Sequence, residues 1–320
     1  MEETPKGKGK RAVKILFFGT SKFAVEPLKA LIDSLSFDIV GVVSTPDAMG
    51  KRGKKIIQPP VKEQALKHSI DVFQFEKLKD SNTIETLKKI EADIYVVVSY
   101  GKFIPNEILR LPKYGAINIH PSLLPKYRGP SPINYALLNG DKFTGVSIIS
   151  VTNKMDAGDI YMQWIEKILP EDNYKTLHDR LSRIGAKMIL CLLENFQKIK
   201  PVPQDESLAT YTKIIQKEDG LINFKNETAK QIINKIKAFY EWPSAYFFYR
   251  GKQFKILDAE LIKLKEKKPG VVTKVTKKEL VIGCKENAIS IRKIQPQSKK
   301  IMDIQAFLAG YKFNVGETIQ

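Results

Sequence analysis

Three polar residues of this chain have side chains that can stabilise a developing negative charge and move a proton: Asn118, His120 and Asp156. Asn118 and His120 alternate with Ile117 and Ile119, which predicts a strand with one polar and one apolar face. The amide of Asn118 can donate to an oxyanion, and the imidazole of His120 can donate to the same oxygen or carry a proton near neutral pH. Asp156 can orient the imidazole or accept the proton through a water molecule.

Each of these residues also has an ordinary structural explanation. A histidine at the end of a strand more often makes a structural hydrogen bond, an asparagine there usually fixes a turn, and an aspartate close to Gly158 can be a turn residue. Asp159 lies in the same loop and is a second candidate for the carboxylate. Cys191 and Cys284 lie far from these motifs and form no metal-binding pattern, so we expect neither a thiol nucleophile nor a metal. Two isolated cysteines are also typical of a reducing compartment.

The sequence around these residues resembles that of the folate-dependent formyltransferases. The resemblance is carried by residues 118–125 (Asn-Ile-His-Pro-Ser-Leu-Leu-Pro), by Arg128 and Gly129, and by residues 155–159 (Met-Asp-Ala-Gly-Asp). It runs from about Lys14 to near the C-terminus. Within the family, it is greatest to the members that formylate methionyl-tRNA.

Two positions depart from the family pattern. Ala157 stands where the family usually has threonine, and Pro130 stands where it usually has alanine. Neither change removes a group with proton chemistry, so the departures concern the detail of the loops rather than the activity.

The resemblance implies transfer of a formyl group from 10-formyltetrahydrofolate to the free amino group of initiator methionyl-tRNA. In such a reaction the amine attacks the formyl carbon, a tetrahedral oxyanion forms, and a proton passes from the attacking nitrogen to the leaving nitrogen. The resemblance implies Asn118, His120 and Asp156 as the catalytic residues; Asp156 is preferred to Asp159 because it occupies the aspartate of the family's Asp-x-Gly pattern. It also implies a folate-binding loop, which consists of Ser122, Leu123, Leu124 and Pro125.

A basic loop follows the second predicted strand. Residues 45–55 contain two glycines and show no apolar periodicity, and their four cations are Lys51, Arg52, Lys54 and Lys55. Flexible basic loops suit phosphate contacts, although a solvated run of charge explains the same residues. The resemblance favours tRNA binding, because related enzymes use this insertion against the tRNA acceptor arm.

Strands and helices alternate in the first part of the chain, which predicts a doubly wound, Rossmann-like α/β domain. Short strands with basic turns recur in the last part, which predicts a small OB-like β-barrel. The expected segments are a disordered basic tail at 1–11, a formyltransferase catalytic domain at 12–199, a linker at 200–216 and a tRNA-binding barrel at 217–320.

Positive charge is concentrated in the predicted barrel. The whole chain of 320 residues has a net charge of +18, which indicates a polyanionic partner, although a lysine-rich proteome explains it equally well. Residues 217–320 contain 21 basic and 11 acidic residues. Cations on the hairpins of a small barrel would neutralise an RNA backbone without reading its bases.

Other functions remain open at this point. Enzymes with the same catalytic domain formylate glycinamide ribonucleotide or amino-sugar nucleotides, or release formate, and a non-enzymatic nucleic-acid-binding protein is a further alternative. A basic second domain argues against the first two, and the catalytic residues argue against a pure binding protein. Residues 1–11 lack the apolar core of a signal peptide, and no run approaches the ~18 apolar residues that cross a bilayer. We therefore expect a cytoplasmic monomer with no membrane contact.

Overall fold

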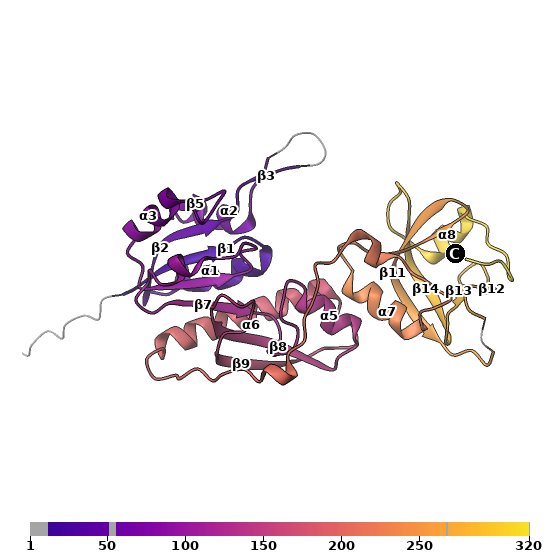
Figure 1. Cartoon of the computed structure of the whole chain (residues 1–320). Helices are drawn as coiled ribbons and strands as arrows, with labels where there is room; N and C mark the ends of the chain where they lie inside the picture. Colours follow the sequence, from indigo (N-terminus) through magenta and orange to yellow (C-terminus); the bar gives the residue numbers. More distant parts are fainter. Residues whose placement is uncertain (1–11, 51–55, 267, 320) are drawn as a thin grey trace, which may run out of the picture. The chain divides into compact units, whose positions relative to one another are not determined.

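The computed structural model describes residues 12–50, 56–266 and 268–319 (Figure 1). The described residues form two compact units, each of which combines segments that are distant in sequence. The first unit is made of the described parts of Met1–Arg128, Gly145–Ile165 and Asp179–Ala209. The second unit is made of Gly129–Thr144, Glu166–His178 and the described parts of Thr210–Gln320. The predicted tail at 1–11 lies outside the described residues.

The larger sheet has seven strands in the order β5-β2-β1-β6-β7-β8-β9. Its first five strands run parallel, and β8 is antiparallel to β7. The strands are β1 (Val13–Gly19), β2 (Phe37–Ser44), β5 (Val72–Gln74), β6 (Ile94–Val98), β7 (Ala116–His120), β8 (Phe143–Ser150) and β9 (Ile160–Lys167). Parallel strands need crossover connections, and helices supply them here.

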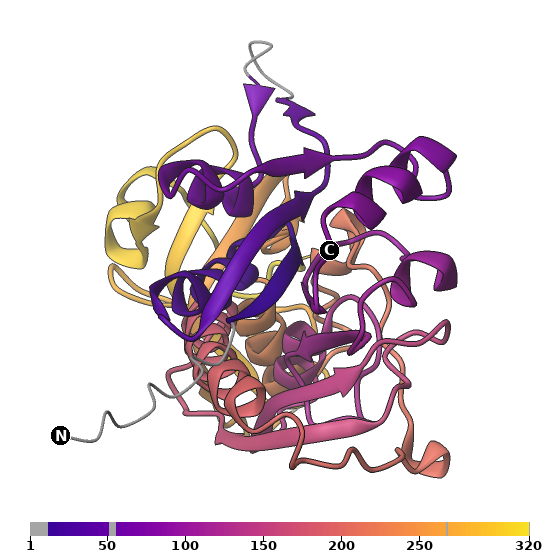
Figure 2. The same ribbon diagram turned by 90° about the vertical axis from the view of Figure 1, so that its left-hand side faces the viewer.

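Helices cover both faces of this sheet, which confirms the doubly wound fold (Figures 1 and 2). One face is closed by an apolar cluster between β1, β6 and the helices α3 and α4. The helices of this region are α1 (Val25–Asp33), α2 (Pro60–Lys67), α3 (Ser81–Lys89), α4 (Asn106–Leu109) and α6 (Tyr174–Glu194). Among the described residues, no helix is long and apolar enough to span a bilayer.

The alternation of side chains along β7 decides which face of the sheet carries the polar residues. Ala116 packs into the cluster with α3 and α4, whereas Ile119 lies against Gly185 of α6 on the opposite face. Because successive side chains of a strand point to opposite faces, Asn118 and His120 share the face of Ala116.

A short hairpin encloses the basic loop after β2. The strands β3 (Ala48–Met49) and β4 (Ile56–Ile57) pair antiparallel. The expectation of an irregular segment over residues 45–55 is therefore wrong at residues 48–49, because their main chain is paired with apolar residues just beyond the basic run. Residues 51–55 of the loop lie outside the described part of the chain.

Three polar side chains anchor the base of this hairpin. Lys62 Nζ donates to both carboxylate oxygens of Asp47, at 2.9 and 2.8 Å, and to Gln74 Oε1 at 2.7 Å. Gln74 Nε2 donates in turn to Asp47 Oδ1 at 2.8 Å. The hydrogen bond from Lys62 lowers the pKa of Asp47, so the anchor keeps its charge at neutral pH.

The second unit contains the expected small OB-like fold as an antiparallel sheet of six strands, with β15 beside β14 and the others in the order β10-β11-β14-β13-β12. The strands are β10 (Ala245–Tyr249), β11 (Lys252–Ile262), β12 (Val272–Val275), β13 (Leu280–Gly283), β14 (Ala288–Pro296) and β15 (Met302–Asp303). The helices are α5 (Pro132–Leu138), α7 (Ala229–Ala238) and α8 (Ile304–Gly310). The core includes Phe247, Phe254 and Phe307.

The helices α5 and α7 are joined by reciprocal hydrogen bonds. Asn134 Nδ2 donates to the carbonyl of Ala238 at 2.8 Å, and Asn234 Nδ2 donates to the carbonyl of Leu138 at 3.1 Å. Each amide satisfies a carbonyl at the end of the other helix, where no intrahelical donor is available. The second unit therefore includes a helix from the middle of the chain.

The segment predicted as a linker has regular contacts in its first half. Val202 and Ile160 exchange two main-chain hydrogen bonds, at 2.9 and 2.8 Å. A short 3₁₀ helix follows over Glu206–Leu208, and the first unit extends to Ala209. Residues 200–209 are thus part of the first unit rather than a free connection.

We predict that Thr228→Ala lowers the free energy of unfolding by about 1 kcal/mol, because Thr228 caps α7. Thr228 Oγ1 accepts from the Gln231 N–H at 3.2 Å, and Gln231 Oε1 accepts from the Thr228 N–H at 2.8 Å. Urea unfolding measures the change, with Lys230→Ala in the same turn as the control. Equal unfolding free energies for the two variants would mean that the cap contributes nothing.

Candidate active site

The predicted catalytic residues are brought together on one face of β7. Asp156 Oδ2 lies 3.6 Å from His120 Nδ1, and Asp156 Oδ1 lies 3.5 Å from Asn118 Nδ2. One carboxylate therefore faces both the amide and the imidazole. The exposed fraction of the side chain is 6% for His120 and 17% for Asp156, so the pair is partly shielded from water. A shielded pair interacts more strongly than the same pair in bulk water.

The direction of β8 requires the loop that carries Asp156 to fold back toward β7. In the antiparallel register, His120 pairs with Ser147 and Ile117 pairs with Ser150, so β8 ends beside the start of β7. The next loop must return along β7 to bring Asp156 to the two polar side chains. The main chain of Asp156 has φ of 49°, in the left-handed region that side chains other than glycine seldom adopt.

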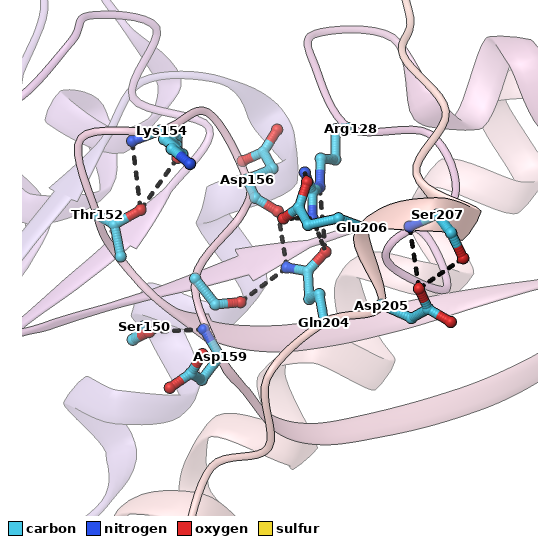
Figure 3. Close-up of polar contacts among 11 residues, drawn as sticks. Arg128, Ser150, Thr152, Lys154, Asp156, Asp159, Gln204, Asp205, Glu206 and Ser207 are labelled. Carbon is cyan, nitrogen blue, oxygen red and sulfur yellow. Dashed lines mark hydrogen bonds and ion pairs between the residues drawn. The ribbon is translucent and has the colours of Figure 1, made fainter.

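Gly158 permits the loop to close against β8. A Cβ atom at this position would lie 1.8 Å from the carbonyl oxygen of Ser150, so only glycine fits. Ser150 and Asp159 then exchange hydrogen bonds: the Ser150 N–H donates to the Asp159 carbonyl, and the Asp159 N–H donates to Ser150 Oγ, both at 2.9 Å. Figure 3 shows the carboxylate of Asp159 directed away from Asp156.

The hydrogen bonds of His120 define its tautomer. His120 Nε2 lies 2.9 Å from the carbonyl oxygen of Tyr127. A carbonyl oxygen only accepts, so Nε2 must carry the hydrogen. Nδ1 is then the nitrogen that can take up or release a proton, and it is the nitrogen that faces Asp156. At 3.6 Å the contact between Nδ1 and Oδ2 is electrostatic, slightly longer than a direct hydrogen bond.

The loop predicted to bind folate is held by the buried side chains of Ser147 and Ser122 and by the exposed Gln163. Ser147 Oγ donates to the carbonyl of Ser122 at 2.7 Å and accepts from the Leu124 N–H at 3.1 Å. Gln163 Nε2 donates to the Leu124 carbonyl at 2.8 Å, and the hydroxyl of Ser122 donates to the Lys126 carbonyl at 2.6 Å. The main chain of Leu124 and the hydroxyl of Ser122 are therefore engaged within the protein.

Leu123 and Pro125 are the half-buried members of this loop, whereas Ser122 and Leu124 are buried. If the segment contacts a ligand, its apolar side chains are the groups that remain available. The assignment of Ser122, Leu123, Leu124 and Pro125 to folate stays a prediction.

The loop after β6 is tied to the loop after β1. Thr20 Oγ1 donates to the carbonyl of Tyr100, and Ser21 Oγ donates to Ser99 Oγ, both at 2.8 Å. Tyr100 is buried, its hydroxyl has no hydrogen-bond partner, and burial raises its pKa to about 12. An unpaired buried hydroxyl in this loop is a group that a bound polar molecule could satisfy.

Three residues outside the predicted set support the Asp156 loop. Gln204 Nε2 donates to the main-chain carbonyls of Asp156 and Gly158, and its Oε1 accepts from Arg128, which also binds Glu206 (Figure 3). Arg128 belongs to the sequence motif, but the motif alone predicts no function for its side chain. Gln204 and Glu206 lie in the segment predicted as a linker, where no periodicity or motif marks them.

The structure does not place the predicted tRNA-binding cations, because Lys51, Arg52, Lys54 and Lys55 lie outside the described residues. In the ranges that the structure describes, no group of three His, Cys, Asp or Glu side chains is arranged to hold a metal ion.

Both halves of the chain match known formyltransferase models. Residues 13–193 match the family described as formyl transferase, and residues 214–312 match the family described as formyl transferase, C-terminal domain. Together with the doubly wound fold and the polar cluster on β7, these matches define the class of the protein: the chain belongs to the formyltransferase family.

The relatives narrow this class further. The methionyl-tRNA formyltransferase of Sulfurihydrogenibium sp. (strain YO3AOP1) is 43% identical over 313 residues, which are 96% of this chain and 100% of the relative. The solved structure of methionyl-tRNA formyltransferase from Clostridium thermocellum aligns with a TM-score of 0.56 at 19% identity, over 78% of this chain and 93% of that one. The similarity to this structure shows the fold alone.

A longer protein shares the same fold. HypX from Aquifex aeolicus, crystallised in complex with tetrahydrofolic acid, aligns with a TM-score of 0.60 at 18% identity. The alignment covers 96% of this chain but 50% of HypX, so the chain spans about half the length of that protein.

We predict that His120→Ala lowers formyl transfer by about 10²- to 10³-fold, the usual effect of removing one oxyanion donor, and that Asp156→Asn lowers it by about 10²- to 10⁴-fold, the usual effect of removing a general base. The fold should persist, because neither side chain belongs to the apolar clusters. Asp159→Asn is the matched control in the same loop and should retain most of the activity. If Asp159→Asn is the inactive variant, the carboxylate has been assigned to the wrong residue.

Proposed function

We propose that the protein transfers the formyl group of 10-formyltetrahydrofolate to the amino group of initiator methionyl-tRNA, giving formylmethionyl-tRNA for translation initiation. The observation that carries the proposal is the convergence of Asn118, His120 and Asp156 on one face of β7 in a member of the formyltransferase family. The name and the full-length similarity of the 43% identical relative support the choice of acceptor.

The first step is attack of the amine nitrogen on the formyl carbon. A C–N bond forms, and the electron pair of the carbonyl moves to its oxygen. The Asn118 amide N–H can donate to this oxygen, as can His120 when Nδ1 is protonated. His120 Nε2 does not serve here, because its hydrogen is held by the carbonyl of Tyr127.

The second step returns the electron pair and breaks the bond between the formyl carbon and the folate nitrogen. The attacking nitrogen loses a proton, for which the Asp156 carboxylate is the acceptor, directly or through water. The leaving nitrogen gains a proton, which the Asp156–His120 pair can supply. One proton therefore passes through the pair, and no covalent enzyme intermediate is needed.

The two parts of the chain have separate proposed roles. The catalytic site lies within residues 12–199, most of which belong to the first unit, and Ser122 to Pro125 lie on its folate side. The bound tetrahydrofolate in the crystallised HypX relative supports a folate site in this fold. Residues 217–320 bind tRNA through its backbone, and the loop with Lys51, Arg52, Lys54 and Lys55 contacts the acceptor arm. We propose that the enzyme acts as a monomer in the cytoplasm.

Local ion pairs reduce the positive charge that the second part can offer to RNA. Lys274 Nζ lies 2.5 Å from Glu279 Oε2, and Lys268 Nζ lies 3.3 Å from Glu266 Oε2. Arg292 pairs with Glu260. Exposed cations of the same region that remain candidates for phosphate contacts include Lys263, Lys265, Lys277 and Lys278.

We predict that the protein consumes 10-formyltetrahydrofolate when charged initiator tRNA is supplied. Uncharged tRNA, free methionine and an amino-sugar nucleotide should give background rates, because the acceptor must provide both an amine and an RNA backbone. Tetrahydrofolate release and formylated tRNA are measured together. Turnover with the sugar nucleotide but not with tRNA would identify the amino-sugar branch of the family, and formate release without acceptor would identify a hydrolase.

We predict that changing the loop residues Lys51, Arg52, Lys54 and Lys55 together to Gln raises the KM for tRNA and leaves the affinity for the folate unchanged. Each lost phosphate contact should also flatten the salt dependence, by roughly 0.7–0.9 in the log–log slope. The matched control removes the same number of positive charges by changing four exposed lysines of the first unit to Gln: Lys67, Lys88, Lys89 and Lys198. A tRNA dependence that matches this control variant would contradict the role of the loop.

A further inference from the structure

The side chain of Gln204 is hydrogen-bonded to the loop that carries Asp156, and that of Glu206 is bonded to Arg128, although both residues belong to the segment that leads out of the catalytic unit (Figure 3). We infer that Gln204, clamped by Arg128 and Glu206, is the positioning residue that holds Asp156 against His120. This inference rests on the proposed function and adds to it a support that lies outside the motifs of the sequence.

The amide of Gln204 can be oriented in only one way. Nε2 lies 2.8 Å from the carbonyl oxygen of Asp156 and 2.7 Å from that of Gly158. Oε1 lies 3.1 Å from Arg128 Nε and 2.8 Å from Arg128 Nη2. Carbonyl oxygens only accept and a guanidinium only donates, so a reversed amide would lose all four bonds. Both the donor and the acceptor of the Gln204 amide are therefore used in this orientation.

The hydrogen bonds from Gln204 to the carbonyls of Asp156 and Gly158 fix the main chain that orients the Asp156 side chain. A donor on the carbonyl of Asp156 sets the peptide plane that follows this residue, whose own φ lies in the left-handed region. The donor on the carbonyl of Gly158 sets a second plane, while the Cα of Gly158 is pressed against Ser150. The loop is therefore held between β8 on one side and Gln204 on the other.

Arg128 holds Gln204 in turn. Its side chain is 1% exposed, and a buried cation needs a partner that compensates for its lost hydration. Glu206 supplies the compensation with both oxygens, at 2.9 Å from Nη1 and 2.9 Å from Nη2. This hydrogen bonding lowers the pKa of the Glu206 carboxyl, although that side chain is 63% exposed. Arg128 is thus fixed by Glu206 on one edge and presents its remaining donors to Gln204.

Gln204→Glu is the variant that tests this arrangement. It keeps the size of the side chain and an acceptor for Arg128, but it replaces the donor by an oxygen that faces two carbonyl oxygens. We expect kcat to fall about 10- to 100-fold, since displacements of about 1 Å can have effects of this size. The matched control is Asp205→Ala, which changes the residue next to Gln204 and removes only the hydrogen bonds between Asp205 and Ser207. This variant should keep the wild-type kcat.

A double-mutant cycle with Asp156→Asn separates positioning from general structural support. If Gln204 acts through the Asp156 carboxylate, Gln204→Glu should change kcat less than about twofold when that carboxylate is already absent, because residues that act as a unit are not additive. An equal loss in both backgrounds would overturn the proposal. So would a wild-type kcat for the single variant Gln204→Glu.

Hydrogen exchange provides a readout that does not depend on activity. The amide of Ala157 donates to the carbonyl of Lys154 within the loop, and the amide of Asp159 donates to Ser150 Oγ at the end of β8. Gln204→Glu should speed their exchange while amides of β7 keep the wild-type rate, and Asp205→Ala should change neither. Unchanged exchange at Ala157 and Asp159 would show that Gln204 does not hold the loop. If the wild-type protein fails to formylate charged tRNA, the proposed function falls, whereas the exchange experiment still decides whether Gln204 holds Asp156.

Discussion

The site depends on one carboxylate being held against two side chains that the sheet has already fixed. Asn118 and His120 are rigid because β7 is paired on both sides, whereas Asp156 belongs to a connection that must fold back over the strand. The 3.5 Å contact with Asn118 is at the limit for a hydrogen bond and the 3.6 Å contact with His120 is just beyond it, so a small change in the loop would open or close them. The precision of the site is therefore set by what supports the loop rather than by the strand.

Local patterns in the sequence predicted the strand, and the structure shows why they were sufficient. The alternation of Ile117 and Ile119 with Asn118 and His120 puts the two isoleucines on the face where Ile119 meets α6 and the two polar residues on the opposite face, which depends only on the period of a strand. The doubly wound fold and the small antiparallel sheet followed from the same reasoning. Asp156 was preferred by family resemblance, because its approach to His120 depends on the return of a loop that no local pattern encodes.

The features that were missed depend on contacts between distant residues. Gln204 and Glu206 are 76 and 78 residues from Arg128, and two prolines nearby indicated only a connection. The hairpin of β3 and β4 is too short for a periodicity to register. Charge counts likewise could not reveal that Lys274, Lys268 and Arg292 each have an acidic neighbour, because composition records the number of charges and not their arrangement.

The order of residues along the segment 204–206 has a mechanical consequence. A pull on the chain from the C-terminal side of Glu206 reaches the exposed ion pair with Arg128 first, and reaches the amide of Gln204 only after that pair has yielded. The ion pair between Glu206 and the buried guanidinium of Arg128 therefore resists such a pull before the hydrogen bonds from Gln204 to the Asp156 loop are loaded.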